Sequence, residues 1–170
     1  MKKRRILFFI FLALSIAINI FILIEGAVDA SGSSSQSLGI TQFIINIFKA
    51  IAPNSRIATD PEFAHHLVRK LIGHFGLFGV SGILTTLTFI FGHTDFDKMK
   101  KRIVINSLAL GLSVAVISEL LQLTAPGRAF AFTDILIDFS GYLLFGGITF
   151  LVYYLIHRRN QKKIKEETKE

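Results

Sequence analysis

The sequence of 170 residues contains no cysteine. This absence excludes disulfides, thiolate metal sites, a cysteine nucleophile and a cysteine-linked lipid anchor. The H-E-x-x-H motif and comparable spacings of metal ligands are also absent. His65, His66 and His74, together with nearby acids, are residue types that zinc uses. Without a ligand spacing to organise them, we expect no metal and no other cofactor.

Acidic residues are scarce: the sequence has twelve Asp and Glu and nineteen Lys and Arg, which gives a formal net charge of +7. A basic balance of this kind is found in proteins that bind nucleic acid. In this sequence, however, the basic residues form short blocks between long apolar runs, and 51% of all residues are hydrophobic. This arrangement indicates a membrane protein, and we expect no nucleic-acid partner.

Four apolar runs approach or exceed the ~20 residues that a helix needs to cross ~30 Å of hydrocarbon. They cover residues 6–24, 71–91, 103–123 and 135–156. Because these runs are continuous, they lack the alternating pattern of a membrane β-barrel. The sequence therefore predicts an all-α membrane protein whose fold is a bundle of four transmembrane helices.

Three basic blocks indicate the orientation of this bundle in the membrane. Residues 2–5, 92–102 and 158–170 hold fourteen of the nineteen Lys and Arg with five acids, a net charge of +9, whereas the rest of the chain carries −2. Loops rich in Lys and Arg stay in the cytoplasm. Four spans place all three blocks on that side, so we predict a multi-pass protein with cytoplasmic termini. The basic tail, 158–170, is expected to meet anionic lipid headgroups.

The N-terminal segment, residues 1–30, has two interpretations. Its basic start, its apolar stretch and the sequence Val28-Asp29-Ala30 are compatible with a secretory signal that is cleaved after a small residue. The apolar run of residues 6–24 is longer than the ~7–15 residues usual in such signals. We therefore favour a retained transmembrane anchor. Cleavage would leave three spans, and every loop would keep its side of the membrane.

Residues 31–60 form the predicted outer loop between the first two spans. Ser31 to Ser37 has the sequence SGSSSQS, which is typical of a flexible tether. Apolar residues then recur at helical spacing from Ile40 to Ala52, a stretch too short to span a membrane. We predict a short outer amphipathic helix that lies on the membrane surface. The alternative is a helix that packs against the bundle.

The next helix is expected to begin near Thr59 or Asp60, either of which can cap it, with Pro61 in its first turn. It can continue without a break from the outer surface into the second span. Small residues repeat at intervals of three along that span: Gly73, Gly76, Gly79 and Gly82. Such stripes let neighbouring helices approach closely in membranes, so they predict a packing surface.

Charged and polar residues gather at the predicted outer ends of the last three spans. They are Lys70 and His74, Glu119 and Gln122, Arg128 in the following loop, and Asp134 and Asp138. Charged groups at membrane depth are costly and are retained for partners or for function. One interpretation is a structural cluster that fixes helix register. The other is an outward-facing pocket for a lipid phosphate or a glycan carboxylate, with Arg128 and Lys70 as donors.

Catalysis is a further interpretation of the same residues. His74, Glu119 and Asp134 are the candidates for acid–base chemistry. The sequence around them does not mark a nucleophile.

Several of these residues occur in motifs. Lys70-x3-His74-Phe75, Glu119-x2-Gln122, Pro126-Gly127-Arg128-x5-Asp134 and Gly141 resemble the VanZ-like family of bacterial membrane proteins. The resemblance covers about residues 69–147 and implies a compact helical membrane domain, which we place at residues 61–157. One member of that family is associated with low-level resistance to teicoplanin, a glycopeptide antibiotic. This sequence departs from the family pattern at Phe78, where Tyr is usual, and at Asp138, where Asn is usual and supplies two donors that a carboxylate lacks.

The resemblance and the polar cluster together predict a protein of the bacterial cell membrane that acts in the cell envelope. We expect its outer cluster to bind the polar headgroup of a membrane lipid or of a lipid-linked cell-wall precursor. Such binding, or contact with the glycopeptide itself, would influence teicoplanin susceptibility. The alternatives are a membrane-embedded enzyme that acts on such a lipid and a purely structural accessory subunit.

Overall fold

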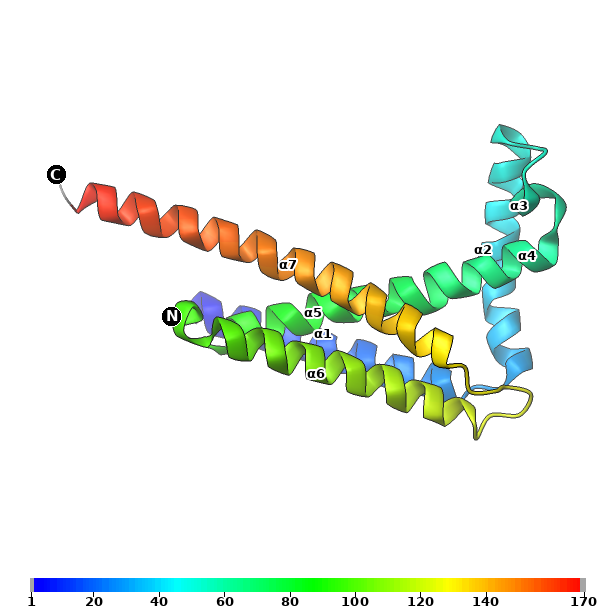
Figure 1. The fold of residues 1–170 in the computed structure, drawn as a ribbon, viewed down its shortest axis with the longest axis horizontal. Coiled ribbons are helices and arrows are strands. Elements are labelled where there is room, and N and C mark those ends of the chain that lie inside the picture. Colours follow the sequence, from blue (N-terminus) through cyan, green and yellow to red (C-terminus); the bar gives the residue numbers. More distant parts are fainter. Residues whose placement is uncertain (1, 169–170) are drawn as a thin grey trace.

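The computed structural model describes residues 2–168, and Lys169 of the basic tail lies outside the described residues. Every element within this range is a helix (Figure 1). The elements are α1 (Lys2–Ala27), α2 (Ala30–Ile51), α3 (Arg56–Thr59), α4 (Pro61–Val68), the π-helix η1 (Arg69–Gly76), α5 (Leu77–Gly92), α6 (Phe96–Gln122) and α7 (Phe132–Glu167).

Four helical stretches of residues 2–168 are long and apolar enough to span a membrane. They are α1, the continuous stretch Pro61–Gly92 that joins α4, η1 and α5, then α6, and α7. The predicted all-α, four-helix membrane fold is therefore confirmed. The helices extend beyond the apolar runs: α7 has 36 residues and is about 54 Å long at 1.5 Å per residue, well above the ~30 Å of hydrocarbon.

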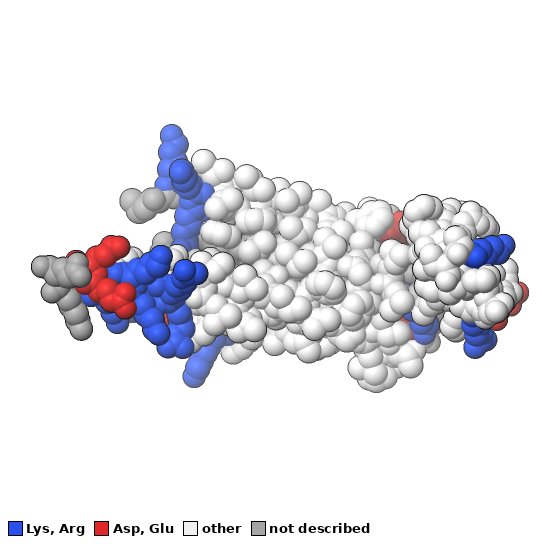
Figure 2. All heavy atoms as spheres, turned by 90° about the horizontal axis from the view of Figure 1, so that it is seen from above, with Lys and Arg blue, Asp and Glu red and all other residues white. Residues whose placement is uncertain are grey.

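The four long helices lie side by side, and α5 packs against α1, α6 and α7. The start of α1 and the end of α7 lie at the same end of the bundle (Figure 1). We call this end the terminal end and the opposite end, where α1 ends and α7 begins, the distal end. Basic side chains gather at the terminal end, and the middle of the molecular surface is free of charge on the face shown (Figure 2). This is the distribution expected of a protein whose middle lies in lipid.

Close helix packing rests on small residues. A Cβ atom at Gly82 would overlap the carbonyl oxygen of Tyr142 on α7, and one at Gly79 would overlap the ring of Phe145. By contrast, a Cβ at Gly73 would meet nothing within 4 Å. The predicted glycine stripe is therefore a packing surface at its α5 end only, and its start in η1 borders open space.

Interhelical hydrogen bonds join the middle of the bundle. The hydroxyl groups of Ser15 and Thr85 lie 2.9 Å apart, and the Tyr142 hydroxyl donates to the Ser107 carbonyl oxygen over 2.8 Å. Polar side chains in lipid need partners from neighbouring helices, because no water is available. These bonds therefore pair α1 with α5 and α6 with α7.

The segment Ser31 to Ser37 was predicted to be a flexible tether, and this prediction is wrong, because these residues form the first turns of α2. Asp29 caps the helix: its Oδ1 accepts hydrogen bonds from the Gly32 amide over 2.6 Å and from the Ser31 hydroxyl over 3.0 Å. The Ser37 hydroxyl donates a hydrogen bond to the Ser34 carbonyl oxygen over 3.0 Å. A cap and side-chain bonds of this kind offset the weak helix propensity of serine and glycine.

The rest of α2 confirms a helix over the residues from Ile40 onward. α2 runs across the long axis of the bundle at the distal end (Figure 1). One face packs on α4 through the buried residues Thr41 and Ile45, while Phe43 and Ile51 on other faces remain 65% and 72% exposed. The predicted alternative of a helix that packs against its neighbours describes one face of α2, and the predicted helix on the membrane surface concerns its exposed apolar face. Contact of the exposed apolar residues with the membrane surface remains a prediction.

Candidate functional site

The site begins with the π-helix η1 between α4 and α5. Its wider turn carries Lys70 and His74, and it contains Gly73 and Gly76, which weaken the α-helical preference. π-helical turns are rare and are frequent at functional sites. α7 lies directly against η1, since a Cβ on Gly141 would overlap the backbone carbonyl of Phe75. This close approach places the first two turns of α7 beside Lys70 and His74.

Acidic side chains of α7 bind the basic side chains of η1 in a row. Lys70 Nζ lies 3.0 Å from Asp134 Oδ1, and His74 Nδ1 lies 2.9 Å from Asp138 Oδ1. The other ring nitrogen of His74, Nε2, lies 4.0 Å from Asp134 Oδ2. Burial increases along the row, from a Lys70 side chain that is 44% exposed to an Asp138 side chain that is 1% exposed.

Asp138 occupies the position at which the resembled family usually has Asn. One of its oxygens, Oδ1, orients the His74 ring, whereas the buried Oδ2 has no hydrogen-bond partner among the described residues. Buried acceptors without a partner are uncommon, and this oxygen can accept a hydrogen bond from a donor group that enters the cavity.

Glu119 has a different role, which is to join α6 to the start of α7. Its side chain is fully buried, and Oε1 accepts a hydrogen bond from the Ala131 amide over 2.6 Å. Its other oxygen accepts a hydrogen bond from the Gln122 side-chain amide. Ala131 is the residue that precedes α7, so this carboxylate satisfies one of the free amides at a helix N-terminus.

Arg128 joins the loop between α6 and α7 to the end of α1. Gly127 adopts a positive φ of 73°, which glycine tolerates, and turns the chain so that Arg128 Nη1 reaches the carbonyl oxygens of Glu25 and Val28 at 2.8 and 3.2 Å. Cations near the last carbonyls of a helix are favourable. Burial, followed by the nearby Arg69 guanidinium, lowers the pKa of Arg128.

Arg69 is a site residue that the sequence analysis did not select. Its guanidinium donates to the hydroxyls of Ser33 and Ser34 on α2 over 3.3 and 3.5 Å. Among residues 2–168, Arg69 has no carboxylate partner within ion-pair distance. Glu25, which follows the first apolar run, was also not selected. The sequence offered one signal for each residue: Arg69 is a basic residue next to Lys70, and Glu25 is an acid at the end of the first span.

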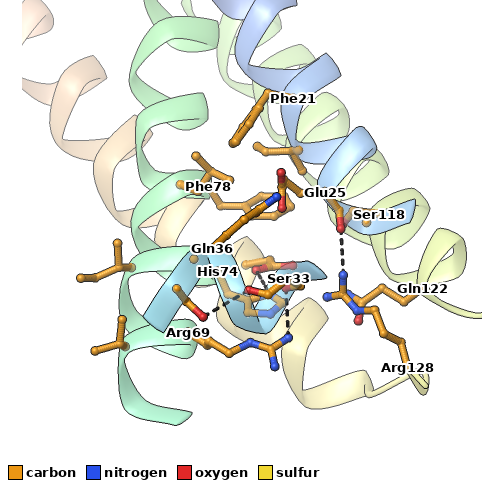
Figure 3. A pocket seen from close by; sticks show the side chains of 18 of the residues that line it. Phe21, Glu25, Ser33, Gln36, Arg69, His74, Phe78, Ser118, Gln122 and Arg128 are labelled. Atoms are coloured by element: carbon orange, nitrogen blue, oxygen red, sulfur yellow. Dashed lines mark hydrogen bonds and ion pairs between the residues drawn. The ribbon is translucent and has the colours of Figure 1, made fainter. Parts of the chain in front are cut away.

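These side chains border a cavity of about 260 Å³ at the distal end (Figure 3). Its polar lining residues are Glu25, Ser33, Gln36, Ser37, Arg69, His74, Ser118, Gln122, Arg128 and Asp138, and its large apolar lining residues are Phe21, Ile22, Ile40, Val68, Ile72, Leu77 and Phe78. In Figure 3 the rings of Phe21 and Phe78 lie toward one end of the cavity, and Arg69 and Arg128 lie toward the other. The cavity is therefore amphipathic.

The structure brings all seven residues that were predicted to bind a ligand to the distal end but divides them into two groups. His74, Gln122, Arg128 and Asp138 line the cavity, whereas Lys70, Glu119 and Asp134 do not line it. Lys70 and Asp134 pair with each other, and Glu119 holds the start of α7. Within residues 2–168, no three His, Asp or Glu side chains gather in an arrangement that could hold a metal ion.

The long apolar helices and the polar cavity at one end of them define a polytopic α-helical membrane protein. A family model described as VanZ/LLP1 matches residues 8–156, from the first turns of α1 to the middle of α7. The chain therefore belongs to the VanZ/LLP1 family. No curated protein and no solved structure matches the chain. Because the matched region includes α1, and Ile22 of α1 lies in the core of the bundle, α1 belongs to the fold of the domain.

Proposed function

We propose that this protein binds the polar headgroup of a membrane lipid in the distal cavity, with the lipid chains directed along the apolar wall. The observation that carries the proposal is the amphipathic lining, in which the rings of Phe21 and Phe78 lie toward one end of the space and the side chains of Arg69 and Arg128 lie toward the other (Figure 3). Pockets that combine an apolar lining with a few placed polar groups are typical ligand sites. A free polar solute has no apolar surface that would contact the apolar wall.

The distribution of basic residues supports an outward position for the cavity. The three basic blocks belong to the terminal end, and the positive-inside rule assigns that end to the cytoplasm. The distal cavity then opens at the outer leaflet of the cell membrane. Outer-leaflet lipids and lipid-linked cell-wall precursors are the partners that fit this location, and through them the protein would influence glycopeptide susceptibility, including that to teicoplanin.

Gly73 offers a direct test by filling the cavity. It lines the cavity, and a Cβ there would meet nothing within 4 Å, so Gly73→Phe adds a large side chain at the cavity wall from a position with open space at its Cβ. The matched control is Gly147→Phe on α7, since Gly147 also has open space at its Cβ and does not line the cavity. Native mass spectrometry of the detergent-purified proteins would measure retained lipid.

We expect the unmodified protein and Gly147→Phe to retain one lipid each, and Gly73→Phe to lose it while its melting temperature stays close to that of the control. Equal lipid retention by both variants would contradict binding in the cavity. The same pair of variants tests the cellular consequence, because Gly73→Phe should remove any effect of the protein on teicoplanin susceptibility at unchanged protein abundance.

A further inference from the structure

Two guanidinium groups line the cavity, and within the part of the chain that the structure describes neither forms an ion pair with a carboxylate. Within residues 2–168, the Arg69 guanidinium donates to two serine hydroxyls, at 3.3 and 3.5 Å, and the Arg128 guanidinium donates to two backbone carbonyl oxygens, at 2.8 and 3.2 Å. Neither has a carboxylate within 4.0 Å among the described residues. Charged groups that leave bulk water are usually paired, so two guanidinium groups without an ion pair at one cavity favour the binding of an anion.

The other charges at the cavity leave room for a single negative charge. Glu25 lines the cavity and makes no ion pair among residues 2–168, while Asp138 is already bonded to His74. Of the charged residues that line the cavity, and with the His74–Asp138 pair counted as neutral, Arg69, Arg128 and Glu25 sum to one positive charge. A phosphate diester carries one negative charge and accepts the paired N–H groups of a guanidinium, a match that a lysine ammonium does not reproduce.

The size of the cavity limits the rest of the headgroup. At about 260 Å³, it lies just below the usual range of small-molecule pockets, about 300–1,000 Å³. A phosphate with a small hydroxylated group fits within this space, whereas the glycan and peptide of a complete cell-wall precursor would extend out of it. Glu25, Gln36 and Ser37 line the same space and offer acceptors for hydroxyl groups.

From these observations we propose that the cavity selects an anionic phospholipid with a small hydroxylated headgroup, such as phosphatidylglycerol, whose phosphate diester lies between Arg69 and Arg128. This inference rests on the proposed function and names its ligand class. It also assigns a binding role to Arg69, whereas Lys70 is held by Asp134 and does not line the cavity. Phe21 and Phe78 would flank the start of the acyl chains.

The experiment compares three probes on the detergent-purified full chain by native mass spectrometry and by lipid-dependent shifts in melting temperature. The probes are dioleoylphosphatidylglycerol, dioleoylphosphatidylcholine and the soluble anion sn-glycerol 3-phosphate. We expect phosphatidylglycerol to bind at least tenfold more tightly than phosphatidylcholine. We also expect sn-glycerol 3-phosphate to bind far more weakly than phosphatidylglycerol, because it lacks the chains that would contact the apolar wall.

Arg69→Gln should lower the affinity for phosphatidylglycerol about tenfold and abolish the preference over phosphatidylcholine. Arg69→Lys keeps the charge but loses the planar fork, so an intermediate loss is expected. Arg56→Gln is the matched control, because Arg56 is an exposed arginine that pairs with Asp60 and does not line the cavity. Melting temperatures measured without lipid identify any variant that fails to fold. If Arg69→Gln fails to fold, the affinity of Arg69→Lys for phosphatidylglycerol tests the role of Arg69 in its place.

Each outcome has a distinct meaning. If phosphatidylcholine binds as tightly as phosphatidylglycerol and Arg69→Gln changes neither affinity, the anionic selectivity is refuted, while lipid binding in the cavity stands. If sn-glycerol 3-phosphate binds as tightly as phosphatidylglycerol, the site is one for a soluble anion and the lipid assignment is refuted. If none of the three probes binds, the proposed function itself fails.

Discussion

Gly141 is the position at which the site is most sensitive to a small change. Replacing it by Ala would place a Cβ 2.9 Å from the Phe75 carbonyl carbon and in overlap with the attached oxygen. Because the obstacle is the backbone of η1, no side-chain rotation relieves it, and α7 must move away. Overpacking of this kind costs about 1–3 kcal/mol, and here the separation also stretches the Lys70–Asp134 and His74–Asp138 contacts.

The magnitude follows from two opposing effects. Alanine is favoured over glycine inside a helix by about 1 kcal/mol, and the overlap with rigid backbone lies at or above the upper end of the overpacking range, about 3 kcal/mol. A net destabilisation of about 2 kcal/mol corresponds to a loss of about 4–8 °C in melting temperature for a chain of this size. Thermal unfolding in detergent, followed by size-exclusion chromatography, measures this change.

Gly147→Ala on the same helix is the control. Its Cβ meets nothing within 4 Å, so only the helix preference changes and the melting temperature should hold or rise. Equal melting temperatures for Gly141→Ala and Gly147→Ala would refute the close approach of α7 and η1, and with it the geometry of the whole site.

Three further predictions concern other parts of the distal end. Glu119→Gln should cost about 1–3 kcal/mol, because an amide cannot accept from both of its present N–H donors; unchanged thermal stability would contradict this. The hydrogen bond from the Gly32 amide lowers the pKa of Asp29. The helix cap should therefore be complete above the ordinary pKa of 3.8 and be lost as the pH falls through the lowered pKa. Amide hydrogen exchange in α2 of Asp29→Ala should exceed that of the unmodified protein at pH 7 and equal it below the lowered pKa. A single cysteine at Ser34 should react with an impermeant reagent added outside cells, whereas one in the loop between α5 and α6 should not, and the reverse would overturn the orientation.

The transmembrane fold could be predicted because the signal is local. Each apolar run of about 20 residues specifies a spanning helix on its own, and nothing else in the chain competes with it. The segment 31–37 shows the limit of this approach. Its composition predicts a tether. The Asp29 cap supports the helix, as do the contacts of the Ser33 and Ser34 hydroxyls with Arg69, which join residues 36 and 35 positions apart.

The location of the site could be predicted from the sequence, but which of its residues line the cavity and which pair with each other could not. The depth of the charged residues indicated one cluster, and the structure places them together at the distal end. Which of two adjacent basic residues faces a cavity depends on helix rotation, and the π-helical turn of η1 changes that rotation. Lys70 therefore pairs with Asp134 while Arg69 borders the cavity, a distinction that no spacing rule for α-helices supplies.

A structural cluster and a ligand pocket were alternative interpretations of the sequence, and the structure shows both helix-joining contacts and a cavity at the distal end. The Lys70–Asp134 pair and the Glu119 hydrogen bonds join helices, as a structural cluster should. Arg128 also joins α1 to the loop before α7, yet it lines the cavity with Arg69. Loss of Arg128 should therefore affect stability as well as lipid binding, and this is why Arg69 and Gly73 are the better positions for testing function.

An experimental structure of the protein in lipid nanodiscs that contain phosphatidylglycerol tests the central claim most directly. The account predicts density for one lipid in the distal cavity, with a phosphate in contact with Arg69 and Arg128 and acyl chains that leave past Phe21 and Phe78. A cavity that holds only water, with ordered lipids bound elsewhere on the bundle, would contradict it.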